Sequence, residues 1–100
     1  MKITTVKNDE TVTLRLDGWL DTVSSPELGA AVDAIGACRA IVLDFDKVEY
    51  IASSGLREVV ACHRKAKDLG ASFSLVNVGH ETMSIFTLTG LDKKLNITAK

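Results

Sequence analysis

The chain has 100 residues, of which 46% are hydrophobic and 25% are charged, a mixture typical of one globular domain over residues 1–100. Its formal net charge of −1 gives no reason to expect a nucleic acid or an anionic membrane surface as a partner. No apolar run approaches the ~18 residues of a membrane span and the N-terminus has no signal-peptide pattern, so we expect a soluble, cytoplasmic protein without direct membrane contact.

The first third of the chain predicts a hairpin followed by a helix. Apolar and polar residues alternate over residues 11–17, as in a half-buried strand, and residues 3–6 form a weaker strand before it. The polar residues KNDE favour an antiparallel turn between the two. The segment SSPEL then opens a helix, in which Ser24 or Ser25 can cap the free N–H groups and Glu27 completes a capping box.

The remainder predicts strands that alternate with helices. The continuous apolar run AIVLDF, residues 40–45, is typical of a parallel strand covered on both faces, and residues 46–52 form a loop or a short strand extension. The later elements are a helix from Ser53 or Ser54 to Gly70, a strand over residues 72–78, a shorter helix over residues 80–89 and an edge strand over residues 95–98. The order β-β-α-β-α-β-α-β indicates an α/β domain with a mixed, mostly parallel sheet of four or five strands and flanking helices.

The stretch YIASSGLR, residues 50–57, places Ser53 and Ser54 at a predicted helix N-terminus, where ligands of open α/β sheets commonly bind. One interpretation is a helix cap, in which a serine oxygen accepts a backbone N–H bond worth about 1 kcal/mol. The other is a phosphoacceptor, because a helix N-terminus tolerates an added phosphate of about −1.5 to −2 charges. Such a phosphate would leave the helix intact and obstruct a partner docked over the loop.

The sequence predicts no enzyme, no metal site and no cofactor. The serine loop has no histidine to act as a base, and neither a G-x-S-x-G elbow nor a P-loop is present. Asp44 and Asp46 have the spacing of a solvated strand end, without a partner acid or base. Cys38 and Cys62 lie in apolar stretches without companion ligands, so we expect reduced, buried thiols.

Three segments together resemble STAS domains, especially the bacterial anti-sigma factor antagonists. IVLDFDKVEYIASSGLREVV, residues 41–60, is similar to the strand, loop and helix around that family's Asp-Ser-Ser-Gly-Leu motif. LRLDGWLDTVSSPEL, residues 14–28, resembles its Gly-x-Leu-Asp segment, and LTGLDKKLNI, residues 88–97, resembles its C-terminal Gly-Leu and short strand. The resemblance covers nearly the whole chain, in order and with similar spacing.

The resemblance implies a function and a set of site residues. The chain would bind an anti-sigma factor that is a serine kinase, release a sigma factor, and be switched off by phosphate on Ser54, with Ser53 as the alternative acceptor. Asp21 matches the acidic residue near that serine, and Gly55 and Leu56 match the start of the helix that contacts the kinase. The partner-binding residues expected are Asp21, Ala52, Ser53, Gly55, Leu56 and Trp19.

Two residues leave alternatives open. Ala52 stands where the family often has Asp, and its loss of a carboxylate either favours a phosphate nearby or removes a contact that a kinase needs. The alternative function is therefore a STAS subunit of a transporter or signalling complex that binds its partner without phosphorylation. Trp19, in a predicted loop, is either an anchor for a partner or a cover for one end of the core. We expect a monomer or a weak dimer.

Overall fold

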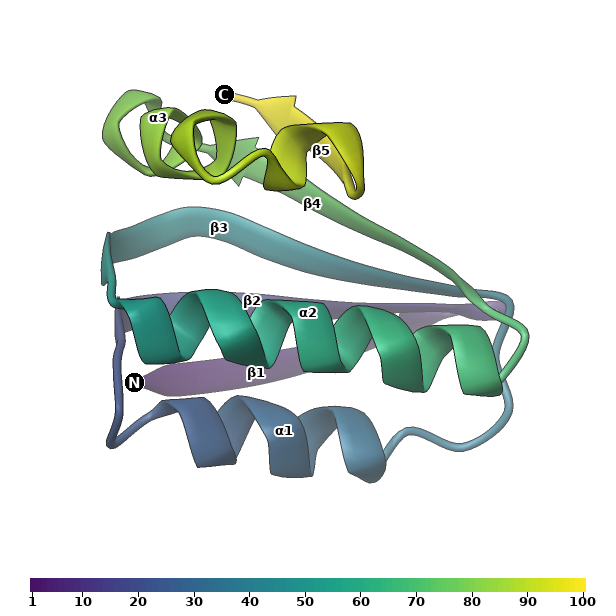
Figure 1. Cartoon of the computed structure of the whole chain (residues 1–100). Helices are drawn as coiled ribbons and strands as arrows, with labels where there is room; N and C mark the ends of the chain where they lie inside the picture. Colours follow the sequence, from purple (N-terminus) through teal and green to yellow (C-terminus); the bar gives the residue numbers. More distant parts are fainter.

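The strands of this protein lie side by side in the order in which they occur along the chain (Figure 1). The computed structural model describes residues 1–100 and contains one five-stranded sheet. Its strands are β1 (Lys2–Asn8), β2 (Thr11–Leu20), β3 (Ala40–Ile51), β4 (Ser72–Val78) and β5 (Asn96–Ala99). β1 pairs antiparallel with β2, whereas all later pairs are parallel. The predicted α/β class, element order and mostly parallel sheet are confirmed.

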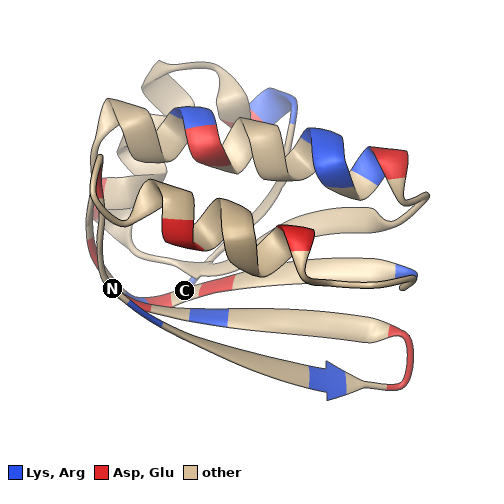
Figure 2. Ribbon diagram, turned by 90° about the horizontal axis from the view of Figure 1, so that it is seen from below, with Lys and Arg blue, Asp and Glu red and all other residues tan.

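The helices connect the parallel strands and cover one face of the sheet. They are α1 (Ser25–Asp33), α2 (Ser53–Asp68) and α3 (His80–Leu88), with a 3-10 turn at Leu91–Lys93 that the sequence did not predict. Each connection leads to the next strand in the same direction, so right-handed crossovers place all three helices on the same side. Figure 2 shows this arrangement, with the other face of the sheet uncovered and charges of both signs interspersed.

The core lies between the sheet and the helices. Alternate residues of the central strands point into it, with Leu14, Leu43 and Leu75 in register and fully buried. α2 contributes Val59 and Cys62 from one face, at helical spacing. Burying a side chain of this size stabilises the fold by about 1.5–3 kcal/mol, so these positions hold α2 firmly against the sheet.

The two cysteines are free, as expected, but only one is buried. Burial, with a smaller effect of the Glu58 carboxylate, raises the pKa of the Cys62 thiol to about 12. Cys38 is only half-buried, so the expectation of two buried thiols is wrong for this residue. It lies between the end of α1 and the start of β3, where the backbone is irregular and covers it less completely.

The strand after the apolar run is longer than predicted. Residues 46–51 continue β3 and pair with β2, in which Gly18 lies opposite Val48 and Trp19 opposite Tyr50. The pairing shifts by one residue at each of two bulges, which breaks the regular alternation that marks a strand in the sequence. Trp19 is consequently part of β2, and the prediction that it lies in a loop is wrong.

The serines at both helix starts do not form the predicted caps. Ser24 is the N-cap of α1 but its hydroxyl donates back to the carbonyl oxygen of Trp19, at 2.6 Å, and makes no cap bond. The N-cap of α2 is Ala52, which has no side-chain acceptor, so neither Ser53 nor Ser54 caps that helix. The capping interpretation of these serines is therefore wrong.

Candidate functional site

The loop after β2 and the start of α2 meet at one edge of the sheet. The strands β2 and β3 are parallel neighbours and end together, with Leu20 opposite Ile51. The N–H of Ala52 donates to the carbonyl oxygen of Leu20, at 2.9 Å. The hydroxyl of Thr22 donates to Oγ of Ser54, at 3.1 Å. Two segments that are about thirty residues apart in the sequence therefore form one surface.

A glycine allows this close approach. A Cβ atom on Gly55 would lie 2.5 Å from the carbonyl oxygen of Leu20 and 2.9 Å from side-chain atoms of Leu20 and Ile51. Backbone cannot move aside as a flexible side chain can, so only glycine fits here without displacing α2. Gly55 is buried beneath the surface that the sequence assigns to the partner, and it sets how near Ser54 lies to the β2 end.

Asp21 organises the loop between β2 and α1. Its Oδ1 accepts hydrogen bonds from the N–H groups of Val23, at 3.1 Å, and Ser24, at 3.0 Å. The hydroxyl of Ser24 accepts from the N–H of Asp21, at 2.9 Å. The backbone hydrogen bond from Ser24, opposed by some desolvation and joined by further bonds from Ser24 and Val23, holds the pKa of the Asp21 carboxyl below its usual range. Asp21 is therefore an ionised residue in a fixed turn.

The two candidate phosphoacceptors differ in exposure. Ser53 is exposed, whereas Ser54 is half-buried and its hydroxyl bonds with Thr22 in an exposed position. Ala52 adopts the extended conformation typical of an N-cap, with φ −90° and ψ 170°, and α2 has no acidic residue in its first turn. The first N–H groups of α2 thus lack a side-chain acceptor, and the positive end of the helix is not compensated by a carboxylate of its own.

An aromatic pair lies at the ends of the same two strands. The rings of Trp19 and Tyr50 are 5.4 Å apart between centroids, and Trp19 Nε1 donates to a carboxylate oxygen of Glu49, at 3.3 Å. Trp19 is 57% exposed, so it does not cover the core. Leu56, in contrast, is half-buried and packs against the core. Among the expected partner residues, Trp19 therefore offers the larger apolar surface to a binding protein.

A shallow hollow beside Ser54 contains residues that the sequence analysis missed. It measures about 330 Å³ and is lined by Thr22, Ser25, Pro26, Ser54, Arg57, Glu58 and Ala61. Thr22 had no signal in the sequence, since its contact with Ser54 depends on how β2 and β3 end together. The sequence did carry a signal for Arg57, because a residue three positions after a helical serine lies on the same side of the helix.

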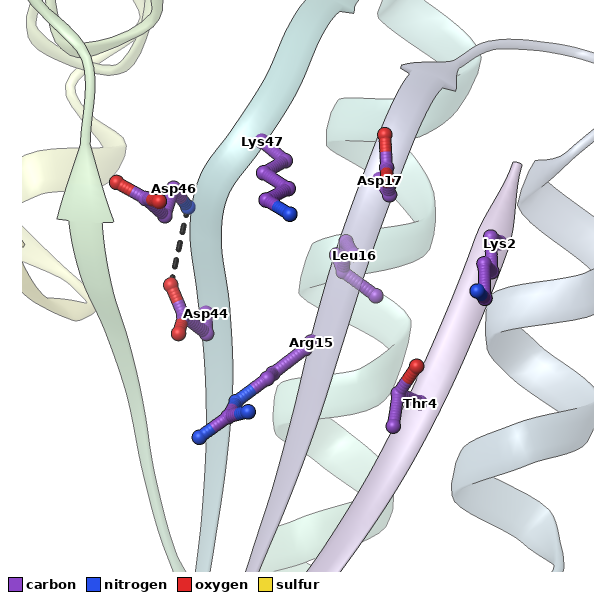
Figure 3. A pocket seen from close by; sticks show the side chains of 8 residues that line it. All are labelled: Lys2, Thr4, Arg15, Leu16, Asp17, Asp44, Asp46 and Lys47. Atoms are coloured by element: carbon purple, nitrogen blue, oxygen red, sulfur yellow. Dashed lines mark hydrogen bonds between the residues drawn. The ribbon is translucent and has the colours of Figure 1, made fainter.

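A second hollow, of about 310 Å³, lies on the uncovered face of the sheet and involves neither serine (Figure 3). It is lined by Lys2, Thr4, Arg15, Leu16, Asp17, Asp44, Asp46 and Lys47. Asp44 Oδ1 accepts from the N–H of Asp46 and from Nδ2 of Asn77, both at 3.0 Å, and Asp46 pairs with Lys100 at 3.3 Å. The two aspartates are thus occupied within the chain, and they lie inside β3 rather than at its end, so the prediction of a solvated strand end is wrong in its placement.

Two other kinds of site are not found in the structure. No group of three or more His, Cys, Asp or Glu side chains is arranged to hold a metal ion. None of the helices combines the length and the apolar character needed to span a bilayer.

Comparison with known proteins assigns the chain to a family. Residues 3–98 match the sequence profile described as "Mlab, STAS domain". The anti-sigma-B factor antagonist of Bacillus subtilis (strain 168) is 29% identical over 97 residues, covering 94% of this chain and 87% of the relative. The crystal structure of an anti-sigma factor antagonist from Mycobacterium paratuberculosis superimposes with a TM-score of 0.87 at 28% identity, covering 99% of this chain and 86% of that one. The fold is also that of Bacillus SpoIIAA in its unphosphorylated form, with a TM-score of 0.81 and 24% identity over 99% of this chain and 90% of the other. The chain belongs to the STAS domain family and has anti-sigma factor antagonists among its relatives.

Proposed function

We propose that this protein is an anti-sigma factor antagonist that binds an anti-sigma factor with serine kinase activity and is released by phosphorylation of Ser54. The observation that carries the proposal is the contact between Thr22 and Ser54, at 3.1 Å, which joins the serine hydroxyl to the loop after β2 in an exposed position, one residue from the ionised Asp21. Two relatives that cover most of the chain are named as anti-sigma factor antagonists, which supports the same class.

The switch follows from the position of Ser54. The kinase transfers the γ-phosphoryl group of ATP to Ser54 Oγ, which gives up its proton, and ADP leaves. The phosphate adds about −1.5 to −2 charges at the start of α2, where free N–H groups favour an anion. The fold therefore survives, whereas a partner docked flush against Thr22 and Ser54 meets new volume and charge and dissociates.

Trp19 is the proposed anchor of the partner surface. Large aromatic side chains contribute most to binding when a partner desolvates them, and Trp19 and Tyr50 expose 57% and 48% of their surfaces at this edge. Trp19→Ala should weaken binding by more than tenfold, or about 1.4 kcal/mol. Leu88→Ala is the matched control, because Leu88 is 86% exposed on α3, outside the proposed surface.

The test combines phosphorylation and binding. The purified protein is incubated with ATP and the anti-sigma kinase encoded nearest to it, and mass spectrometry locates the phosphate. We expect phosphate in the wild type and in Ser53→Ala but none in Ser54→Ala, and we expect Ser54→Asp to weaken the complex measured by calorimetry. Absence of both phosphate and complex would overturn the proposal. Binding of a transporter subunit that Ser54→Asp leaves unchanged would establish the alternative function, a STAS subunit that acts without phosphorylation.

A further inference from the structure

The hollow beside Ser54 contains one positive charge. Arg57 is the only cationic residue among its lining residues, and Glu58 is the only acidic one. Arg57 is exposed and takes part in no salt bridge, in contrast to Arg39, which pairs with Glu10, and Lys65, which pairs with Asp33. An unpaired guanidinium therefore lies beside the serine hydroxyl that Thr22 contacts.

The spacing of Ser54 and Arg57 allows them to interact directly. Both belong to α2, and residues three apart on a helix have Cβ atoms about 5–6 Å from each other on the same side. An arginine fork binds phosphate oxygens with two parallel N–H bonds, which is stronger and more directional than a lysine contact. The hydroxyl of Thr22, 3.1 Å from Ser54 Oγ, reaches the same hollow from the loop after β2.

We propose that Arg57 is the intramolecular ligand of a phosphoryl group on Ser54, with the Thr22 hydroxyl as a second donor. The proposal rests on Ser54 as the acceptor and extends the proposed function to how the phosphorylated state is held. The guanidinium binds two phosphoryl oxygens from α2, while Thr22 binds from the loop, so the phosphate ties α2 to the end of β2. In the unmodified chain the Thr22 hydroxyl already contacts Ser54, whereas the Arg57 guanidinium is unpaired and free to turn toward a phosphate.

Acidic groups around the hollow are directed elsewhere. The carboxylate of Asp21 is engaged by the N–H groups of Val23 and Ser24. The Glu58 carboxylate extends toward α1, since a Cβ on Gly29 would lie 2.5 Å from its Oε1. Glu27, on α1, is exposed and is not among the lining residues. These three carboxylates oppose the phosphate dianion, and Arg57 is the lining residue that favours it.

The experiment places phosphoserine at position 54 during translation, so it needs no kinase and no partner. Phosphorus NMR follows the second ionisation of the phosphate, whose ordinary pKa is about 6. An adjacent cation favours the dianion, so we expect this pKa to lie below that of a phosphoserine peptide by about half a unit or more. Arg57→Gln should raise it toward the peptide value, whereas Arg57→Lys should keep more of the shift.

Two controls make the result decisive. Arg64→Gln removes another exposed arginine, about 15 Å along α2 from Ser54, and should leave the phosphate pKa unchanged. Thr22→Val tests the second donor and should raise the pKa by less than Arg57→Gln does. Far-UV circular dichroism verifies that each variant is folded. A phosphate pKa at or above the peptide value in the wild type, or one that Arg57→Gln and Arg64→Gln change equally, would refute the proposal. Either result would leave phosphorylation by a kinase untouched, so the two proposals fail separately.

Discussion

Restoring a side-chain cap to α2 should stabilise the protein. Ala52 has N-cap geometry but no acceptor, and the helix has no acidic residue in its first turn. A capping box is not available, because its acid would replace Gly55, where even a Cβ would lie 2.5 Å from the carbonyl oxygen of Leu20. A hydroxyl at position 52 itself can satisfy one free N–H group, of Ser54 or Gly55.

The expected gain follows from that single hydrogen bond. Ala52→Ser should raise the free energy of unfolding by about 1 kcal/mol, which corresponds to about 4–8 °C in Tm for a domain of this size. Ala52→Asp should gain a further ~0.3–1 kcal/mol, because its negative charge faces the positive end of the helix. Urea denaturation at pH 7, followed by circular dichroism, measures both. In the chain with phosphoserine at position 54, the extra gain of Asp over Ser should disappear, since two charges ~4 Å apart repel by about 1 kcal/mol in water.

The control separates capping from a general effect of serine. Ala30→Ser changes an exposed position inside α1, where serine is a poorer helix former than alanine, and it should reduce stability by about 0.5 kcal/mol. If Ala52→Ser gives no gain, or a loss like that of Ala30→Ser, then the first N–H groups of α2 are not short of an acceptor. In that case the account of Ala52 as an uncapped start is refuted.

Three further predictions concern the packing, the loop and the thiols. Gly55→Ala should lower the free energy of unfolding by about 1–3 kcal/mol, because its Cβ clashes with β2. Gly79→Ala should change it little, because nothing lies within 4 Å of the new Cβ. An equal effect of both substitutions in urea denaturation would argue against the close approach of α2 to β2. Because the Asp21 pKa is lowered in the folded state, its contribution is present above the pKa of the unfolded chain and is lost as the pH falls through the folded value. Asp21→Asn should therefore be less stable than the wild type at pH 7, and the Tm values of the two proteins should converge in acid. A difference in Tm that does not depend on pH would contradict a lowered pKa of Asp21 in the folded state. A thiol reagent at pH 8 should modify Cys38 quickly and Cys62 only on unfolding, and rapid modification of both in the native protein would contradict the burial of Cys62.

The sequence predicted the helices and strands whose hydrophobic residues recur with a regular period. The alternation in β2 and the stripe of α2 follow from burial on one side of the sheet, and each appears where it was expected. The apolar run of β3 is a strand as predicted, but the prediction that both of its faces are covered is wrong, because Ile41, Leu43 and Phe45 are buried whereas the residues between them are only half-buried on the uncovered face. For residues 46–51 the sequence left a loop or a short strand extension open, because two bulges interrupt the period there, and the structure shows the extension. Trp19 was misplaced for the same reason, since its partner Tyr50 lies in that irregular stretch.

The candidate site was predicted in outline but not in its contacts. The resemblance assigned Ser54 and Asp21 to two segments that are distant in the sequence, and the structure joins those segments through Thr22. No pattern within one segment reveals that contact, because it depends on two strands ending side by side. The predicted cap at Ser24 failed for a related reason: its hydroxyl donates to the carbonyl oxygen of Trp19 and accepts from the N–H of Asp21, both outside its own helix.

The two bulges give β3 two more residues than the stretch of β2 that it accompanies. Side chains alternate between the faces of a sheet, so an extra residue reverses the later ones unless a bulge absorbs it, and here each bulge absorbs one residue. Val48 faces inward between the bulges, and Ile51 faces inward after both, in step with Leu20. The position at which α2 starts therefore depends on both bulges. Removing one residue between residues 46 and 50 would remove a bulge or, if no bulge absorbs the change, turn Ile51 toward solvent and separate Thr22 from Ser54.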